Sequence, residues 1–230
     1  MPQPTRRRAA IAGAITLAAG GATDAADRGV VFAGGMASKA STGYVGGTLA
    51  LPGGELGRGL AVRAVGLVNH YRYDGGVGRT RARERGVTLS AVYQWSGAWG
   101  YANLAAGATY RSTRLTPDDT SNPNRGRKWD GVVGVDGARN WGTWRLGGLG
   151  SYQFDLREYY ARIDATRAVA SRLRLGAEFV AQGNPMYDRQ MYGGVVTIPA
   201  GKWEVRLSGG ALVQDTQDGP YAALSLSRVF

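Results

Sequence analysis

The last ten residues of the chain, 221–230, alternate between apolar and polar side chains and end on an aromatic residue. One parity carries Ala222, Leu224, Leu226 and Phe230, and the other carries Tyr221, Ser225 and Ser227. A period of two residues is typical of a strand with one apolar and one polar face. In lipid, such a strand cannot leave its edge open, because the backbone groups there would have no hydrogen-bond partner. We therefore expect the last strand to pair with the first and close a barrel.

The same alternation recurs along the chain and predicts about twelve strands of roughly ten residues each, the pattern of a transmembrane barrel. In the segment 172–182, for example, Leu175 and Phe179 face one way, whereas Arg174 and Glu178 face the other. The predicted strands are 29–38, 43–51, 59–73, 85–95, 99–113, 128–138, 143–154, 158–167, 172–182, 188–198, 202–214 and 219–230. The predicted fold is all-β, a single closed antiparallel barrel of the outer-membrane type. A soluble β-sandwich also alternates, so alternation alone leaves both folds open.

The connections between the predicted strands favour the barrel. Short connections at 52–58, 96–98, 139–142, 168–171 and 199–201 fall at one end, whereas 74–84 and 115–127 at the other end are long and polar. Trp95, Trp99, Trp141, Trp144 and Trp203 lie beside the short turns. The opposite end carries Tyr71, Tyr73, Tyr110, Tyr152, Phe154, Tyr159, Tyr187 and Tyr221. Aromatic girdles at both membrane interfaces, with both termini in the periplasm, explain this distribution.

The N-terminal segment 1–25 has the features of a cleaved signal peptide. Arg6, Arg7 and Arg8 precede a short apolar run at 9–19, and small residues follow. The run is too short to span a bilayer as a helix. The chain has no cysteine, which excludes disulfides and thiolate metal sites. We expect export, cleavage, and one barrel domain over 26–230 in the bacterial outer membrane.

Parity places charges of both signs inside the barrel. The predicted lumen residues are Arg63, Arg111, Asp130, Asp136, Arg145, Arg162, Asp164, Arg174, Glu178, Arg189, Glu204 and Arg206. Paired with one another, these side chains would fill the interior, since buried charges persist when paired. Left unpaired, they would line a polar pathway for a hydrophilic solute. The sequence leaves both interpretations open.

No catalytic or metal-binding pattern is evident, and we predict a protein that is not an enzyme and has no cofactor. His70 is the only histidine, and it shares its parity with Val62 and Val68, which points it away from the lumen. Outer-membrane barrel enzymes that act on lipid or polysaccharide need a histidine base with a serine or carboxylate partner. The oxygen-rich segment 116–126 does not have the spacing of an EF-hand calcium loop.

The outer segments 74–85 and 115–129 carry the candidate surface residues. These are Tyr73, Arg81, Arg83, Asp118, Asp119, Asn122, Arg125 and Trp129. Aromatic rings suit the mixed surface of a sugar, and charged side chains hydrogen-bond its hydroxyls. An ordinary lipid-interface girdle is the competing interpretation. The net charge of +11 is spread over strands and loops, which favours lipopolysaccharide or an acidic polymer over nucleic acid as a partner.

Several segments together resemble the BcsS family of cellulose biosynthesis proteins. The resemblance rests on residues 59–63 with 71–73, 115–119 with 121–123 and 125–126, 183–188, and the tail. It implies a small outer-membrane barrel that assists export or surface handling of the glucan, with cellulose and the synthase machinery as partners. It brings no catalytic residues. A small general porin or structural outer-membrane protein is the alternative, followed by a barrel enzyme.

Overall fold

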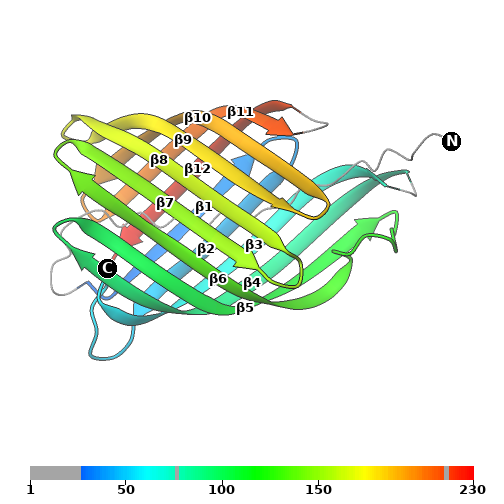
Figure 1. The fold of residues 1–230 in the computed structure, drawn as a ribbon, viewed down its shortest axis with the longest axis horizontal. Helices are drawn as coiled ribbons and strands as arrows, with labels where there is room; N and C mark the ends of the chain where they lie inside the picture. The colour runs from blue at the N-terminus through cyan, green and yellow to red at the C-terminus, as the bar shows by residue number, and fades with distance from the viewer. Residues whose placement is uncertain (1–26, 76–77, 215–217) are drawn as a thin grey trace.

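A computed structural model of the chain describes residues 27–75, 78–214 and 218–230. The predicted signal peptide lies outside these residues and stays a prediction. The strands are β1 (Gly29–Ala37), β2 (Ser41–Ala50), β3 (Gly59–Gly75), β4 (Gly78–Gly97), β5 (Gly100–Thr116), β6 (Gly126–Trp141), β7 (Trp144–Gln153), β8 (Glu158–Ala170), β9 (Leu173–Asn184), β10 (Tyr187–Ala200), β11 (Trp203–Gln214) and β12 (Gly219–Val229). Each pairs with its sequence neighbours antiparallel, and β1 pairs with β12, so the barrel is closed as predicted (Figure 1).

The barrel turns its apolar side chains outward. Val45, Leu89 and Ile163 are each more than half exposed, whereas Arg63 and Glu178, which face the interior, are buried. This arrangement is the reverse of a soluble sandwich and matches a barrel whose outer wall contacts lipid. None of the described residues forms a helix long and apolar enough to cross a membrane.

One side of the barrel is taller than the other. Strands β3 to β6 contain 17, 20, 17 and 16 residues, whereas β1, β2 and β7 contain 9, 10 and 10. We call the part of β3–β6 that extends past β2 and β7 the tall wall (Figure 1, cyan and green). Its flanks are residues 71–75 of β3 and 126–130 of β6, because pairing with β2 ends at His70 and pairing with β7 begins at Val132.

The tall wall corrects the predicted loop at 74–84, which is mostly strand. Asp74 pairs with Arg79 and Tyr73 with Thr80 in a continuous hairpin. The segment is charged on alternate positions, with Thr80 and Ala82 buried between exposed arginines. High charge made it resemble a loop, but the period of two is that of a strand. The long polar segment at the outer end is therefore an extension of β3 and β4 and not a long loop.

The opposite end, where β1 and β12 bring the described termini together, carries five of the six tryptophans. Trp95, Trp99, Trp141, Trp144 and Trp203 are all 42–47% exposed there, as predicted. We call it the tryptophan end. Four of its turns are only two residues long, at 98–99, 142–143, 171–172 and 201–202. Two of these use Gly142 (φ 53°) and Gly201 (φ 64°), in a left-handed conformation that glycine adopts without strain.

Four aromatic residues predicted for the outer girdle face the lumen instead. Tyr71, Tyr73, Tyr187 and Tyr221 are 3–5% exposed. Tyr71 and Tyr73 share the parity of Arg63, so the pleat turns them inward. Tyr152 and Phe154 do face outward, and their rings contact edge to face.

Candidate functional site

The lumen nearest the tryptophan end is bridged by two ion pairs. Arg63 on β3 donates to Asp136 on β6 at 2.7 Å, and Asn103 donates to the other carboxylate oxygen at 2.7 Å. Arg145 on β7 faces Glu204 on β11 at 3.5 Å. Each ion pair joins strands that are not hydrogen-bonded neighbours, so the side chains cross the interior.

The middle of the lumen holds a cluster around Arg206 of β11. Its guanidinium contacts Glu178 at 2.6 Å and Asp164 at 3.2 Å. Arg162 lies 3.6 Å from the same Asp164, and the hydroxyl of Tyr221 donates to Glu178 at 2.8 Å. All five side chains are buried, and the positive charges of the two arginines balance the negative charges of the two carboxylates.

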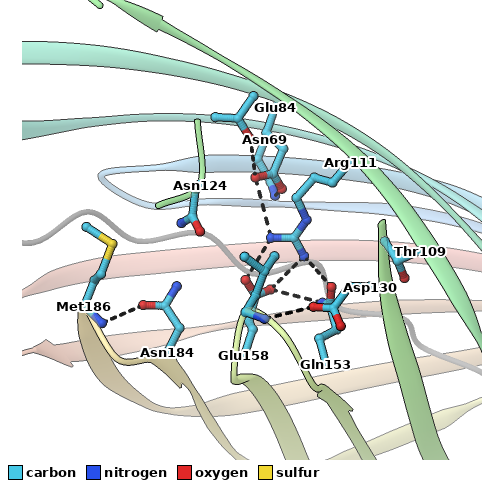
Figure 2. Close-up of polar contacts among 12 residues, drawn as sticks. Asn69, Glu84, Thr109, Arg111, Asn124, Asp130, Gln153, Glu158, Asn184 and Met186 are labelled. Carbon is cyan, nitrogen blue, oxygen red and sulfur yellow. Dashed lines mark hydrogen bonds and ion pairs between the residues drawn. The ribbon is translucent and has the colours of Figure 1, made fainter. Parts of the chain in front are cut away.

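The upper lumen is organised around Arg111 of β5 (Figure 2). Its guanidinium donates to both oxygens of Glu158 at 2.8 and 3.2 Å and to Gln153 at 2.9 Å. Glu84 lies 3.6 Å from the same guanidinium. Glu84 also accepts hydrogen bonds from Asn69 at 3.0 Å and from Thr113 at 3.1 Å. One arginine therefore sits between two carboxylates, and amide and hydroxyl groups complete their hydrogen bonding.

The structure places all the predicted lumen residues on the inner face, but three of them make no ion pair among the described residues. One is Arg189, which is buried with its guanidinium over the ring of Tyr187. The other two are Asp130 and Arg174. Asp130 accepts backbone hydrogen bonds from Asp155 and Leu156 at 2.9 and 3.0 Å, so it holds the β7–β8 turn. Arg174 donates to Thr166 at 3.2 Å and to the backbone carbonyl of Thr143 at 3.1 Å. Neither makes an ion pair among the described residues.

Sequence reasoning missed the two upper carboxylates, Glu84 and Glu158. Glu84 fell at the end of a segment taken for a loop, although it shares its parity with the buried Ala82 and Ser90. Glu158 begins β8 and shares its parity with Arg162. Extending the period of two by one residue from the predicted strand 85–95 finds Glu84, and applying it within the predicted strand 158–167 finds Glu158.

The spaces between these side chains are small. A cavity of about 20 Å³ lies between Arg145, Arg162 and Glu204, and one of about 40 Å³ lies beside Tyr44 and Tyr221. The first has room for about one water molecule and the second for two or three. Neither accommodates a sugar ring.

The segment 117–125 between β5 and β6, here called the rim loop, folds against the tall wall. The hydroxyl of Tyr73 donates to Asp119 at 2.9 Å, and Asp119 also accepts from the Ser121 hydroxyl at 2.6 Å. Asn122 accepts from the backbone of Asn124 at 2.9 Å. Asp119, Asn122 and Tyr73 are thus buried and not part of the exposed surface predicted for them.

The electrostatics of the rim loop fit this geometry. Hydrogen bonds from Ser121 and Tyr73 lower the pKa of Asp119 despite its burial, while burial raises the pKa of Tyr73 to about 12. Tyr73 therefore remains a protonated donor opposite an ionised acceptor. At the exposed tip, Arg125 holds Asp118 through two hydrogen bonds of 2.6 and 2.7 Å, and they lower the pKa of Asp118.

The remaining predicted surface residues face outward. Arg81 and Arg83 lie on the outer face of β4, and Trp129 on β6 is 69% exposed with its ring 5.1 Å from that of Tyr110. His70 is exposed on the same outer face, opposite Arg83, away from the lumen carboxylates. Among the described residues no group of three or more histidine, cysteine or acidic side chains is placed to hold a metal ion.

Solved structures with this fold are outer-membrane barrels. The COG4313 outer membrane channel from Pseudomonas putida F1 has a TM-score of 0.55 at 14% identity, covering 94% of this chain and 100% of the channel. The KdgM porin has a TM-score of 0.51 at 9% identity, covering 87% of this chain and 99% of the porin. The translocator domain of the autotransporter NalP from Neisseria meningitidis has a TM-score of 0.50 at 10% identity, covering 89% and 87%. At these identities the likeness establishes the fold.

Comparison of the sequence with models of protein families is more specific than comparison of the fold. A family model described as "Cellulose biosynthesis protein BcsS" matches residues 30–230, which is the whole barrel from its first strand to its last residue. No curated protein sequence matches the chain.

Proposed function

Because the chain belongs to the BcsS family of cellulose biosynthesis proteins, we propose that it is a non-catalytic outer-membrane accessory protein of bacterial cellulose synthesis. In this proposal it handles the glucan, or holds the synthase machinery, at the membrane surface. The polymer does not pass through its lumen. In this proposal both ends of the described barrel, at the start of β1 and the end of β12, lie on the periplasmic side, and the tall wall faces outside, since outer-membrane barrels keep their short turns in the periplasm.

The observation that carries the proposal is the set of ion pairs across the lumen. They occur at three levels, around Asp136, Arg206 and Arg111. A polymer that displaced these contacts without hydrating the charges would leave each charge buried and unpaired, at about 3–5 kcal/mol per pair. Three levels give a cost on the order of 10 kcal/mol, comparable with the entire stability of a typical domain. The closed lumen therefore favours surface handling over transport.

A porin is the competing function, and the fold is compatible with it. One solved structure with this fold is a "KdgM porin in complex with disordered oligogalacturonate" (TM-score 0.50, 9% identity, covering 87% of this chain and 99% of that one). For that function this chain would need a continuous path past Arg206 and Arg111. The buried ion pairs of Arg206 and Arg111 across the lumen count against such a path.

The barrel enzymes that act on lipid or polysaccharide need a histidine base, and His70 is the sole histidine of this chain. It lies on the outer face, opposite Arg83. Among the described residues, no carboxylate pairs with it there. We propose that neither lipid nor polysaccharide is hydrolysed. Cells that carry His70→Ala should make and modify cellulose as the parent does. Loss of a cellulose modification at normal barrel levels would instead identify an enzyme.

Conductance measurements test the closed lumen directly. We expect the purified protein in planar bilayers to show no stable conductance steps, under conditions where an open porin conducts. Steady single-channel current that cello-oligosaccharides block would establish transport and overturn the surface-handling proposal.

A deletion strain tests the pathway itself. We expect cells without the protein to secrete or retain less cellulose, and re-expression to restore it. A deletion strain with normal cellulose output and attachment would overturn the role in cellulose synthesis, whatever the conductance result.

A further inference from the structure

The outer face of the tall wall is strongly cationic. Its exposed arginines, here called the basic face, are Arg72, Arg79, Arg81, Arg83, Arg85, Arg114 and Arg127. Asp74 is the only acidic side chain that faces outward among the described residues of the tall wall. None of the seven arginines makes an ion pair within the described parts of the chain.

Strand pairing places these cations beside one another. Arg83 lies directly opposite Arg114, and Arg72 lies directly opposite Arg81. Like charges opposite each other on one sheet face destabilise the pairing. The repulsion disappears when an anion binds between them, so the face is suited to a ligand with more than one negative charge.

The basic face borders a hollow beside the β1–β2 turn. One part, about 510 Å³, is lined by Lys39, Arg72, Tyr73, Asp74 and Arg79. An adjoining part, about 300 Å³, is lined by residues that include Lys39, His70, Arg81 and Arg83. Here the flank of β3 has no strand partner, and cations from β3, from β4 and from the β1–β2 turn converge on the space.

The height of the basic face on the barrel indicates where the ligand lies. Val45, Val68 and Val87 are 62%, 44% and 57% exposed on the wall next to it, toward the tryptophan end. Val68 is paired directly with Arg85, so the apolar wall ends where the arginines begin. Cations at the upper limit of a lipid-contacting wall are level with the headgroups of the outer leaflet.

We propose that the basic face and its hollow bind the phosphate groups of lipopolysaccharide, the outer-leaflet glycolipid. Guanidinium groups bind phosphate through paired hydrogen bonds, and several of them can share two phosphates. The acyl chains of the same molecule lie along the valine wall. An acidic polysaccharide would satisfy the charges but would leave this apolar wall unused, so lipid is favoured. The site is independent of the proposed role in cellulose synthesis.

Titration of the detergent-solubilised full-length mature protein with bisphosphorylated lipid A tests the site. The variant carries Arg72→Gln, Arg81→Gln and Arg83→Gln. The matched control carries Arg28→Gln, Arg139→Gln and Arg172→Gln, three exposed arginines at the tryptophan end. Each cation near an anionic membrane surface strengthens binding about fivefold, so we expect the variant to bind roughly 100-fold more weakly and the control to bind as the parent does.

Three further probes separate the ligand classes. Lipid A without phosphates should bind at least tenfold more weakly than the bisphosphorylated form, and inorganic phosphate alone should bind more weakly still. Raised salt should weaken binding because exposed charges are screened. Equal binding by variant and parent, or equal binding of phosphate-free lipid A, would overturn the proposal. Tighter binding of polygalacturonate than of lipid A would assign the face to an acidic glycan instead.

Discussion

Replacing Arg111 with methionine removes the cation that lies between Glu84 and Glu158 in the upper lumen. The substitution deletes three hydrogen bonds, two to Glu158 and one to Gln153, and the 3.6 Å contact with Glu84. Both carboxylates are buried, at 1% and 4% exposure. Removing one partner of a buried ion pair costs about 3–5 kcal/mol, and we expect a loss of that size in the free energy of unfolding.

The control lies three residues further along the same strand. Arg114 is exposed and makes no ion pair among the described residues, so Arg114→Met should change the free energy of unfolding by less than about 0.5 kcal/mol. Denaturant unfolding in detergent micelles, followed by tryptophan fluorescence, measures both variants. Circular dichroism before unfolding verifies that each variant has formed the barrel.

A second substitution separates lost packing from unpaired charge. Adding Glu158→Gln to Arg111→Met removes one uncompensated carboxylate, and we expect it to restore about 1–3 kcal/mol. If Arg111→Met costs less than about 1 kcal/mol, or if the double variant is less stable than the single one, the lumen is not held by coupled ion pairs. In that case the ion pairs would not keep the lumen closed.

Three other predictions follow from the rim loop and the strand contacts. Tyr73→Phe removes the hydrogen bond to Asp119, which is worth about 1.5–3 kcal/mol as a bond to a charged group, so limited proteolysis should cut the segment 117–125 at least tenfold faster while the barrel remains intact. The pKa of Asp119 is lower in the folded protein than in the unfolded chain, so its contribution is complete above about pH 4 and is lost as the pH falls through the folded value; hydrogen exchange in 119–124 should therefore accelerate, beyond the intrinsic pH effect, only under acid conditions. Gly176→Ala should reduce the folded fraction seen by gel mobility, because a Cβ there would lie 1.9 Å from the carbonyl oxygen of Ala165, whereas Gly66→Ala, with its nearest neighbour at 3.8 Å, should not.

Most of the fold follows from one periodicity. A barrel wall separates lipid from a polar interior at every residue, so parity alone places Arg63 inward and Val62 outward. Where residue identity and parity disagree, parity agrees with the structure. The identity of Tyr71 and Tyr73 as tyrosines assigns them to the girdle, and high charge assigns 74–84 to a loop. Both assignments contradict the parity of the neighbouring residues.

The alternation of the sequence does not predict which lumen charges pair with each other. Parity shows that Arg111 and Arg206 point inward, but their partners lie across the lumen on strands far apart in the sequence. Those pairings depend on barrel closure and on the stagger of the strands. The burial of Asp119 and Asn122 likewise depends on how the rim loop folds back, which turn-forming residues do not specify.

The tall wall has a further consequence for association between copies of the protein. A sheet that rises past its neighbours ends in two unpaired edges, at 71–75 and 126–130, and unpaired edges join readily with those of other molecules. Here one edge carries Arg72 and Asp74, and the other carries Arg127 and Lys128. Joining the edges of two molecules would bring these charges together and strip them of water. Charged side chains on an unpaired edge disfavour such joining, so we expect copies that are crowded in a membrane to stay separate.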